Sequence, residues 1–207
     1  MASRVVLDGA GIAVVPDASL VDAVGWLPPG SATDPAHLRS ATGGPVAFPA
    51  FADVLGPATL AYLDETEFRG VTRPDVERMP AGHRELDGLL AAATPDEAGE
   101  SGIDDIESDV FVIRESGRVV AAAGYQRWPG AAAHLCVLTA TGARGRGLAR
   151  AAASAAVEQA LAEGLLPQWR AVPEPSRRVA RTLGFRELGA QLSVRPLAEG
   201  PVLTPRR

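Results

Sequence analysis

From about residue 72 onward, apolar positions follow spacings that alternate between those of strands and those of helices. Short β-type runs stand at residues 76–79, 110–114, 118–125, 134–139 and 166–171, and helical segments at 83–93, 148–162 and 176–183. A further helix start is predicted at Thr94, which is followed by proline. Turn residues 115–117 predict a hairpin, and residues 185–188 with 191–195 predict a second, closing hairpin. This mixture predicts an α/β (α+β) domain.

The first 70 residues carry a weaker pattern and no recognisable chemical motif. The predicted elements are two short strands around a glycine turn at 4–15, a short helix at 18–24, a loop at 27–45, and a strand or short helix at 58–63. We therefore interpret residues 1–70 as an N-terminal extension of unknown role, 71–196 as the main domain, and 197–207 as a loose tail.

One turn of the main domain combines features that bind phosphate. The β-type run at 134–139 leads to Arg-Gly-Arg-Gly-Leu-Ala at 144–149, and an alanine-rich helix follows. In such a strand–turn–helix unit several backbone N–H groups point to one place, and the helix N-terminus adds roughly half a positive charge. The glycines allow close approach of the backbone to a ligand, and the arginines add charge. The alternative is an Arg/Gly-rich surface turn without a ligand.

This turn resembles the signature of the GNAT superfamily of acyl-CoA-dependent N-acyltransferases, (Gln/Arg)-x-x-Gly-x-(Gly/Ala). Arg144, Gly147 and Ala149 fill its fixed positions. Downstream, residues 176–185 resemble the last helix of the family, which ends in Leu-Gly-Phe, and the two motifs stand in the family's order. The resemblance implies the GNAT fold over about residues 72–196, with a mixed, mostly antiparallel central sheet flanked by helices.

The resemblance also implies a reaction and a cofactor. In this family acetyl-CoA lies where the fourth and fifth strands splay apart, and a primary amine of a small molecule or peptide attacks the thioester directly. Catalysis then depends mainly on positioning and on an N–H group that stabilises the oxyanion. By position, the pantetheine would bind to backbone groups of Val137, Leu138 and Thr139. The pyrophosphate would bind to the N–H groups of Arg144, Gly145, Arg146, Gly147, Leu148 and Ala149.

The chain departs from the family's pattern at two positions that bear on catalysis. Pro173 and Ala180 stand where the family often carries Asn and Tyr, so the usual acid for the departing thiolate is missing. Ser176 is the only nearby hydroxyl, and it is equally well explained as the N-cap of its helix. The alternative function is therefore a catalytically inactive acyl-CoA-binding or regulatory module.

A general base must still accept the proton of the amine. His134 is the first candidate, because it is a titratable side chain on the central strand, although a lone histidine on a strand is more often structural. Tyr125, Glu107 and Glu100 are alternatives near the expected acceptor side.

Composition narrows the function classes. All 20 basic residues are arginine, so a Walker A loop and a pyridoxal Schiff base, which both need lysine, are excluded. The single cysteine, Cys136, excludes an internal disulfide and suits a reducing cytoplasm, and we expect it to be a small buried side chain. No metal site is expected.

Charge is distributed unevenly along the chain. Residues 1–108 carry 18 Asp and Glu against 6 Arg, whereas residues 109–207 carry 7 against 14. The second half should attract anionic CoA and the first half a cationic amine, unless each half merely solvates its own surface. The net charge of −5 disfavours a nucleic-acid partner. Without an uninterrupted apolar run we expect neither a signal peptide nor a membrane span, hence a cytoplasmic protein; a homodimer is left open.

Overall fold

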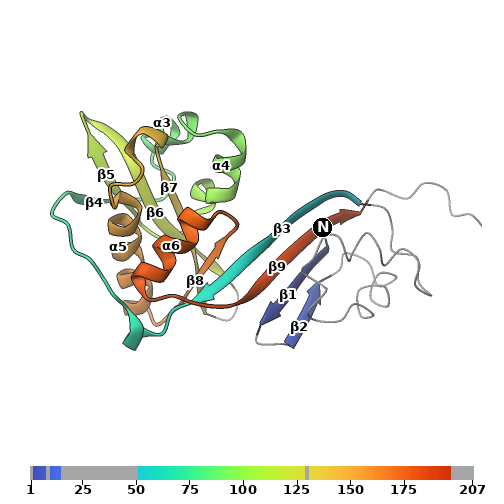
Figure 1. Cartoon of the computed structure of the whole chain (residues 1–207). Helices are drawn as coiled ribbons and strands as arrows, with labels where there is room; N and C mark the ends of the chain where they lie inside the picture. Colours follow the sequence, from blue (N-terminus) through green and yellow to red (C-terminus); the bar gives the residue numbers. More distant parts are fainter. Residues whose placement is uncertain (1, 8–9, 15–50, 129–130, 197–207) are drawn as a thin grey trace, which may run out of the picture. The chain divides into compact units, whose positions relative to one another are not determined.

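The computed structural model describes residues 2–7, 10–14, 51–128 and 131–196 (Figure 1). Three expectations lie outside these residues: the helix at 18–24, the loop at 27–45 and the tail at 197–207.

The chain divides into two compact units, which are described separately. Ala61–Glu187 form one, which we call the core unit, and Met1–Leu60 with Leu188–Arg207 form the other, the strand unit. These limits differ from the expected main domain of 71–196, because strands β3 (Phe51–Tyr62) and β9 (Arg186–Pro196) each contribute to both units.

The core unit contains a mixed sheet. Its strands are β4 (Val76–Met79), β5 (Val110–Glu115), β6 (Arg118–Trp128), β7 (Ala132–Thr139) and β8 (Leu166–Ala171). The order is β8-β7-β6-β5-β4, with the end of β3 beside β8. The strands from β4 to β7 pair antiparallel in succession, whereas β7 and β8 pair in parallel. The predicted mixed, mostly antiparallel sheet is confirmed.

Helices cover both faces of this sheet (Figure 1). They are α3 (Leu86–Ala91), α4 (Pro95–Ser101), α5 (Leu148–Ala162) and α6 (Glu174–Leu183), with short 3-10 turns η3 (Glu65–Glu67), η4 (Ile103–Asp105) and η5 (Thr141–Ala143). Side chains of α5 and α6 form one buried cluster with β6, β7 and β8. Side chains of α3 and η4 form a second cluster with β5, β6 and β7 on the opposite face. The two faces of β7 therefore meet different helices.

Helix α4 begins with the predicted Thr94 cap. Thr94 Oγ1 accepts a hydrogen bond from Glu97 N at 3.2 Å, and Glu97 Oε2 accepts one from Thr94 N at 3.1 Å. This reciprocal capping box satisfies two N–H groups that the helix cannot satisfy itself. It also fixes the backbone at Glu97, whose carboxylate faces the cavity described below.

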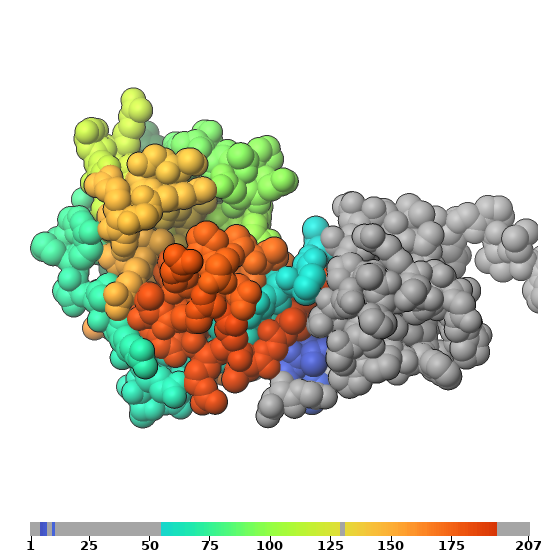
Figure 2. All heavy atoms as spheres, in the orientation of Figure 1, coloured from blue at the N-terminus to red at the C-terminus, as the bar shows by residue number. Residues whose placement is uncertain are grey.

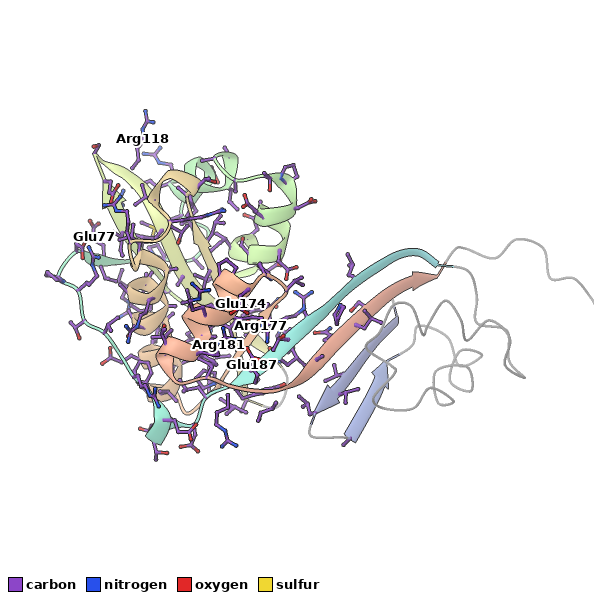
Figure 3. All side chains as sticks on the ribbon, in the orientation of Figure 1. Glu77, Arg118, Glu174, Arg177, Arg181 and Glu187 are labelled. Atoms are coloured by element: carbon purple, nitrogen blue, oxygen red, sulfur yellow. The ribbon has the colours of Figure 1, made fainter. Side chains whose placement is uncertain are left out.

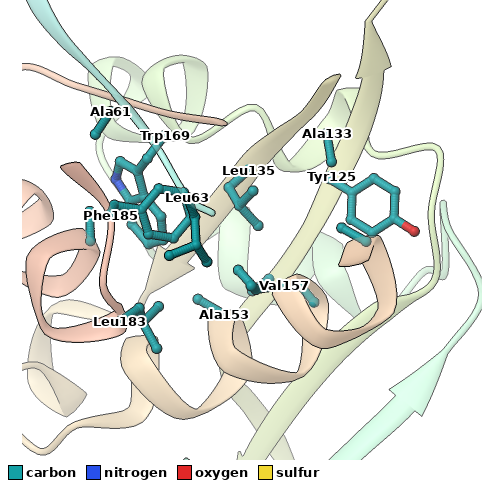
Figure 4. Close-up of a cluster of buried hydrophobic side chains, with 14 of the residues drawn as sticks. Ala61, Leu63, Tyr125, Ala133, Leu135, Ala153, Val157, Trp169, Leu183 and Phe185 are labelled. Atoms are coloured by element: carbon teal, nitrogen blue, oxygen red, sulfur yellow. The ribbon is translucent and has the colours of Figure 1, made fainter. Parts of the chain in front are cut away.

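Helix α5 lies close to the sheet because its buried face is made of small side chains. Ala152, Ala153, Ala156 and Ala160 are completely buried. They pack with larger partners of the strands, including Trp169 of β8 (Figure 4). The close packing holds the start of α5 in a defined place beside the end of β7.

The strand unit shows one wrong prediction and one that is confirmed. Strands β1 (Ala2–Leu7) and β2 (Ala10–Val14) pair antiparallel, as the pattern at 4–15 predicted. The closing hairpin predicted from 185–195 is wrong, because β9 is one continuous strand that pairs with β1. Gly189, which falls between the two runs of the expected hairpin, lies opposite Leu7 in that ladder, and a Cβ there would stand 1.8 Å from Val6 O. The glycine thus permits close approach of two strands.

Candidate active site

Strands β7 and β8 separate after a short paired stretch. Only three pairs join them, ending with His134 opposite Gln168. Beyond this point residues 135–139 of β7 and 169–171 of β8 have no partners across the gap. Their facing N–H and C=O groups, except Thr139 O, which accepts from Arg144 Nε, are therefore open to another molecule. We call the paired end, at His134, the closed end of the opening.

A cavity of about 780 Å³ occupies this opening within the core unit. Its walls come from β7, β8, the turn before α5, the first turn of α5, one face of α6, and α4. Figure 2 shows the atoms of α4, of the start of α5 and of α6 next to one another on the surface. The residues that line it are Asp96, Glu97, Glu100, Ser101, Leu135, Val137, Leu138, Thr139, Ala143, Arg144, Gly145, Gly147, Leu148, Ala149, Arg150, Trp169, Arg170, Ala171, Pro173, Pro175, Ser176, Arg178, Val179 and Thr182. The volume is in the range of sites that hold drug-sized ligands.

Backbone amides at the start of α5 face this cavity without partners. Gly145 and Gly147 adopt φ values of 75° and 78°, which favour glycine, and a Cβ on either would meet nothing within 4 Å. Gly147 is the N-cap and supplies no capping side chain. Within the described part of the chain, the first helical N–H with an acceptor is that of Ala151, which donates to Gly147 O at 3.1 Å. The preceding amides are therefore available to an anion.

The two arginines of the turn point to different places. Arg144 lines the cavity, where Nε donates to Thr139 O at 3.2 Å and Nη2 lies 2.7 Å from Glu97 Oε1. Arg146 instead pairs with Glu115 at the β5–β6 turn, with Nη2 2.5 Å from Oε1, and does not line the cavity. Of the residues predicted to bind the cofactor, Arg146 alone lies outside the cavity wall.

His134 lies at the closed end in a chain of hydrogen bonds. Its Nδ1 is 2.7 Å from Gln168 Oε1, and Gln168 Nε2 donates to Tyr62 OH at 3.1 Å. The ring stacks on Trp128 with centroids 4.3 Å apart and planes 11° from parallel. Burial lowers the pKa of His134, so the imidazole is neutral near pH 7. With Nδ1–H donating to Gln168, Nε2 retains its lone pair.

Most of the elements around the cavity lie in a stretch of the chain that is similar to a known family. The family model described as GNAT acetyltransferase matches residues 110–190, from β5 through the glycine turn into β9. The chain contains a GNAT domain. No curated protein matches the chain.

Several solved structures share the fold over most of this chain. A GNAT-family protein from Novosphingobium aromaticivorans DSM 12444 is 20% identical, covering 72% of this chain and 68% of its own, with a TM-score of 0.57. A GCN5-related N-acetyltransferase from Kribbella flavida is 18% identical over 70% of this chain and only 60% of its own length, with a TM-score of 0.54. A GCN5-related N-acetyltransferase-like protein from Streptococcus suis 89/1591 is 17% identical over 94% and 84%, with a TM-score of 0.52.

The cavity of the GNAT domain has the chemistry that CoA needs. The open strand edges suit the amide groups of pantetheine, and the amides that begin α5 suit a diphosphate. Two buried polar atoms of the wall, Thr139 Oγ1 and Arg150 Nε, have no hydrogen-bond partner in the described residues. Unpaired buried groups of this kind cost free energy unless a ligand or water satisfies them. The residues present therefore fit CoA.

Three of the four predicted catalytic residues are not part of the cavity wall: His134, at the closed end, and also Tyr125 and Glu107. Tyr125 is completely buried, and its register opposite Leu135 puts it on the face of the sheet opposite to His134. In Figure 4 its ring lies at the far end of the buried cluster from Trp169, which lines the cavity. Burial, with a contribution from the Glu163 carboxylate, raises the pKa of Tyr125 far above its usual value.

Glu107 is exposed and acts on the neighbouring strand. Its Oε2 accepts a hydrogen bond from Arg127 N at 2.9 Å, which holds the end of β6. It does not line the cavity, whereas the further alternative, Glu100, does. Glu100 is paired with Arg170 at 3.3 Å.

Ser176 lines the cavity, but the N-cap interpretation of it is wrong. Helix α6 begins at Glu174 with Pro173 as N-cap, so Ser176 stands inside the first turn. Its Oγ accepts a hydrogen bond from Trp169 Nε1 at 3.0 Å. The hydroxyl proton therefore remains available to a second acceptor.

Sequence reasoning missed several polar residues of the site, namely Tyr62, Gln168, Arg150 and Arg178. Gln168 is a buried amide between Pro167 and Trp169 in β8, and that position was the available signal for a specific hydrogen bond. Arg150 and Arg178 could be assigned to the site only from the structure, which shows that they lie on the faces of α5 and α6 that line the cavity.

Two further findings concern the described residues as a whole. Among them no group of three or more His, Cys, Asp and Glu could hold a metal ion, and no helix has the length and apolar character needed to cross a membrane. Cys136 is buried as expected, and burial raises its pKa to about 12. The thiol is therefore protonated and unreactive near neutral pH.

Proposed function

We propose that the GNAT domain transfers an acetyl group from acetyl-CoA to a primary amine of a small molecule or peptide. The observation that carries the proposal is the continuity between the β7–β8 opening and the unpaired amides at the start of α5, which form one cavity. Pantetheine would lie along Val137, Leu138 and Thr139, and the diphosphate against the amides of the turn. Acetyl-CoA supplies an acyl group already activated as a thioester.

His134 is the proposed base. Its neutral imidazole donates Nδ1–H to Gln168, so the lone pair on Nε2 can accept the proton of the amine. Its position opposite Gln168, at the point where the strands part, puts it beside the closed end of the opening.

Ser176 is the proposed donor toward the departing sulfur. The hydroxyl lies in the cavity wall, and because its oxygen already accepts from Trp169 Nε1, its proton is directed elsewhere. A serine hydroxyl is a weak acid, so we assign it a hydrogen bond to the sulfur, with water as the final proton source.

The alternative is a catalytically inactive acyl-CoA-binding or regulatory module, which the departures at Pro173 and Ala180 favour. Ala180 is buried and supplies no polar group. Incubation of acetyl-CoA with a panel of amines, with detection of free thiol, separates the two functions. Amine-dependent thiol release supports transfer, whereas CoA binding without release supports the alternative.

CoA binding itself is tested by thermal unfolding. If the cavity binds CoA, a concentration of about 100 times the dissociation constant should add roughly 2.7 kcal/mol to the free energy of unfolding. An unchanged midpoint at millimolar CoA would contradict both functions. We also propose a cytoplasmic location, because the single thiol in the described residues, Cys136, is free and buried, which suits a reducing compartment.

A further inference from the structure

The arginines of α6 fall into two sets. Arg177 and Arg181 pair with acids beside them: Arg177 Nη2 is 2.6 Å from Glu187 Oε2, and Arg181 Nη1 is 2.8 Å from Glu187 Oε1 (Figure 3). Glu174 completes this network. Arg178, between them in the chain, pairs with no acid among the described residues and lines the cavity instead.

The direction of Arg178 follows from the helix. Five residues of α6 line the cavity: Pro175, Ser176, Arg178, Val179 and Thr182. All except Ser176 are spaced at i, i+3, i+4 and i+7 and so form one face. From α5, Arg150 Nη2 donates to Thr182 O at 3.3 Å. Arg150 thus contacts α6 four residues beyond Arg178, about 6 Å along the helix axis, and both side chains line the wall where α5 meets α6.

The other cavity arginines are already neutralised. Arg144 pairs with Glu97 at 2.7 Å, and Arg170 pairs with Glu100 at 3.3 Å. Arg150 and Arg178 have no such partner in the described part of the chain, and Arg150 Nε is buried without a hydrogen bond. The uncompensated positive charge of the cavity is thus concentrated on the side where α5 meets α6.

We propose that Arg150 and Arg178 bind a phosphate monoester, the 3′-phosphate of CoA, and that the domain thereby selects CoA over dephospho-CoA. The inference rests on the proposed function, because it takes the diphosphate to bind at the start of α5. The 3′-phosphate is one ribose away from that diphosphate, and Arg150 belongs to the first turn of the same helix. A phosphate monoester carries nearly two negative charges at pH 7, and guanidinium groups bind such oxygens in bidentate fashion.

Calorimetric titration of the full chain with CoA and with dephospho-CoA tests this assignment. We expect CoA to bind at least about tenfold more tightly, the value expected for charge-assisted hydrogen bonds to one added group. In Arg178→Gln the ratio of the two dissociation constants should fall toward one, mainly because CoA binds less tightly. Arg177→Gln is the matched control, since it removes a neighbouring arginine that faces Glu187, and it should keep the wild-type ratio.

Each outcome discriminates. Equal affinity of the wild-type chain for the two ligands would overturn the inference and leave the proposed function intact. Binding of neither ligand would overturn the proposed function. If the chain discriminates but Arg178→Gln and the double variant Arg150→Gln/Arg178→Gln retain the full ratio, the assignment to these arginines is wrong. Thermal unfolding of each variant shows whether it is folded under the conditions of the titration.

Discussion

The two ends of the β7–β8 opening are built from different chemistry. At the closed end, His134, Gln168 and Tyr62 form a chain of uncharged hydrogen-bonding groups, and burial keeps the imidazole neutral. At the other end, the unpaired amides that begin α5 and the guanidinium groups of Arg150 and Arg178 offer positive potential. Neutral groups with a free lone pair suit proton transfer, whereas fixed positive groups suit phosphate.

If acetyl-CoA binds as proposed, the closed end of the opening serves proton transfer and the start of α5 serves phosphate binding. A ligand that is anionic at one end and uncharged at the other would be oriented by this gradient alone. Changes at the closed end should therefore alter turnover with little effect on CoA affinity, and changes at the start of α5 should do the reverse. The variants below test this separation.

The largest effect is expected for His134→Gln, which removes the lone pair of the base. If His134 accepts the amine proton, kcat should fall by roughly 10²- to 10⁴-fold, the usual contribution of general-base catalysis. The dissociation constant of CoA, measured by titration, should stay within about twofold of wild type. Full turnover in the folded variant would rule out His134 as the base, and an equal loss of affinity would remove the distinction between the two ends.

The next effect concerns the other end of the cavity. Gly147→Ala inserts a Cβ where the amides face open space, and CoA affinity should fall by about tenfold or more because the diphosphate loses close contact. Gly164→Ala is the matched control: it lies just beyond the C-terminal end of α5, with a φ of 72° and open space around its Cβ position.

Both substitutions place alanine in the left-handed region, at a cost of about 1–2 kcal/mol in the free energy of unfolding. The two variants should therefore show similar melting temperatures but different CoA dissociation constants. Similar CoA affinities in the two variants would show that the start of α5 does not hold the diphosphate.

A smaller effect is expected for Gln168→Glu, which tests Gln168 as a positioning residue for His134. A carboxylate in place of the amide oxygen would favour the imidazolium, so the pKa of His134 should rise, by roughly 1–2 units. The acidic limb of the kcat profile should then move to higher pH by the same amount. A role of Gln168 confined to packing would change the rate without moving this limb.

The fold was largely predictable because it depends on local patterns. The apolar runs from 76 to 171 predicted β4 to β8, and the Thr94 cap and the helix after the glycine turn were predicted within a few residues. The strand β9 was not predicted, because a glycine such as Gly189 is compatible with two structures. It favours a turn, and it also permits close contact with another strand. Only the position of Val6 decides between them.

The candidate site was predictable only where one segment of the chain makes it. The residues of the GNAT-like signature, 144–149, are contiguous, so the sequence could predict them as one group, and all except Arg146 line the cavity. The partner of His134 is 34 positions away, and the pairing depends on where β7 and β8 part. Arg146 pairs with Glu115 on another turn and so does not line the cavity, and sequence spacing does not reveal which acid it pairs with.

The smallest effect concerns stability and tests whether the closed end is neutral. Burial lowers the pKa of His134 from 6.5, so the unfolded chain binds a proton there more readily than the folded one. The contribution of neutral His134 to the free energy of unfolding should therefore be fully present above about pH 6.5. It should decrease as the pH falls below that value. Carboxylates with lowered pKa values, such as Glu97 and Glu187, lose their contribution only at lower pH, below their usual 4.5. Between pH 7.5 and 5.5 wild type should thus lose more thermal stability than His134→Gln, and equal losses would mean that His134 is already solvated and not part of a neutral end.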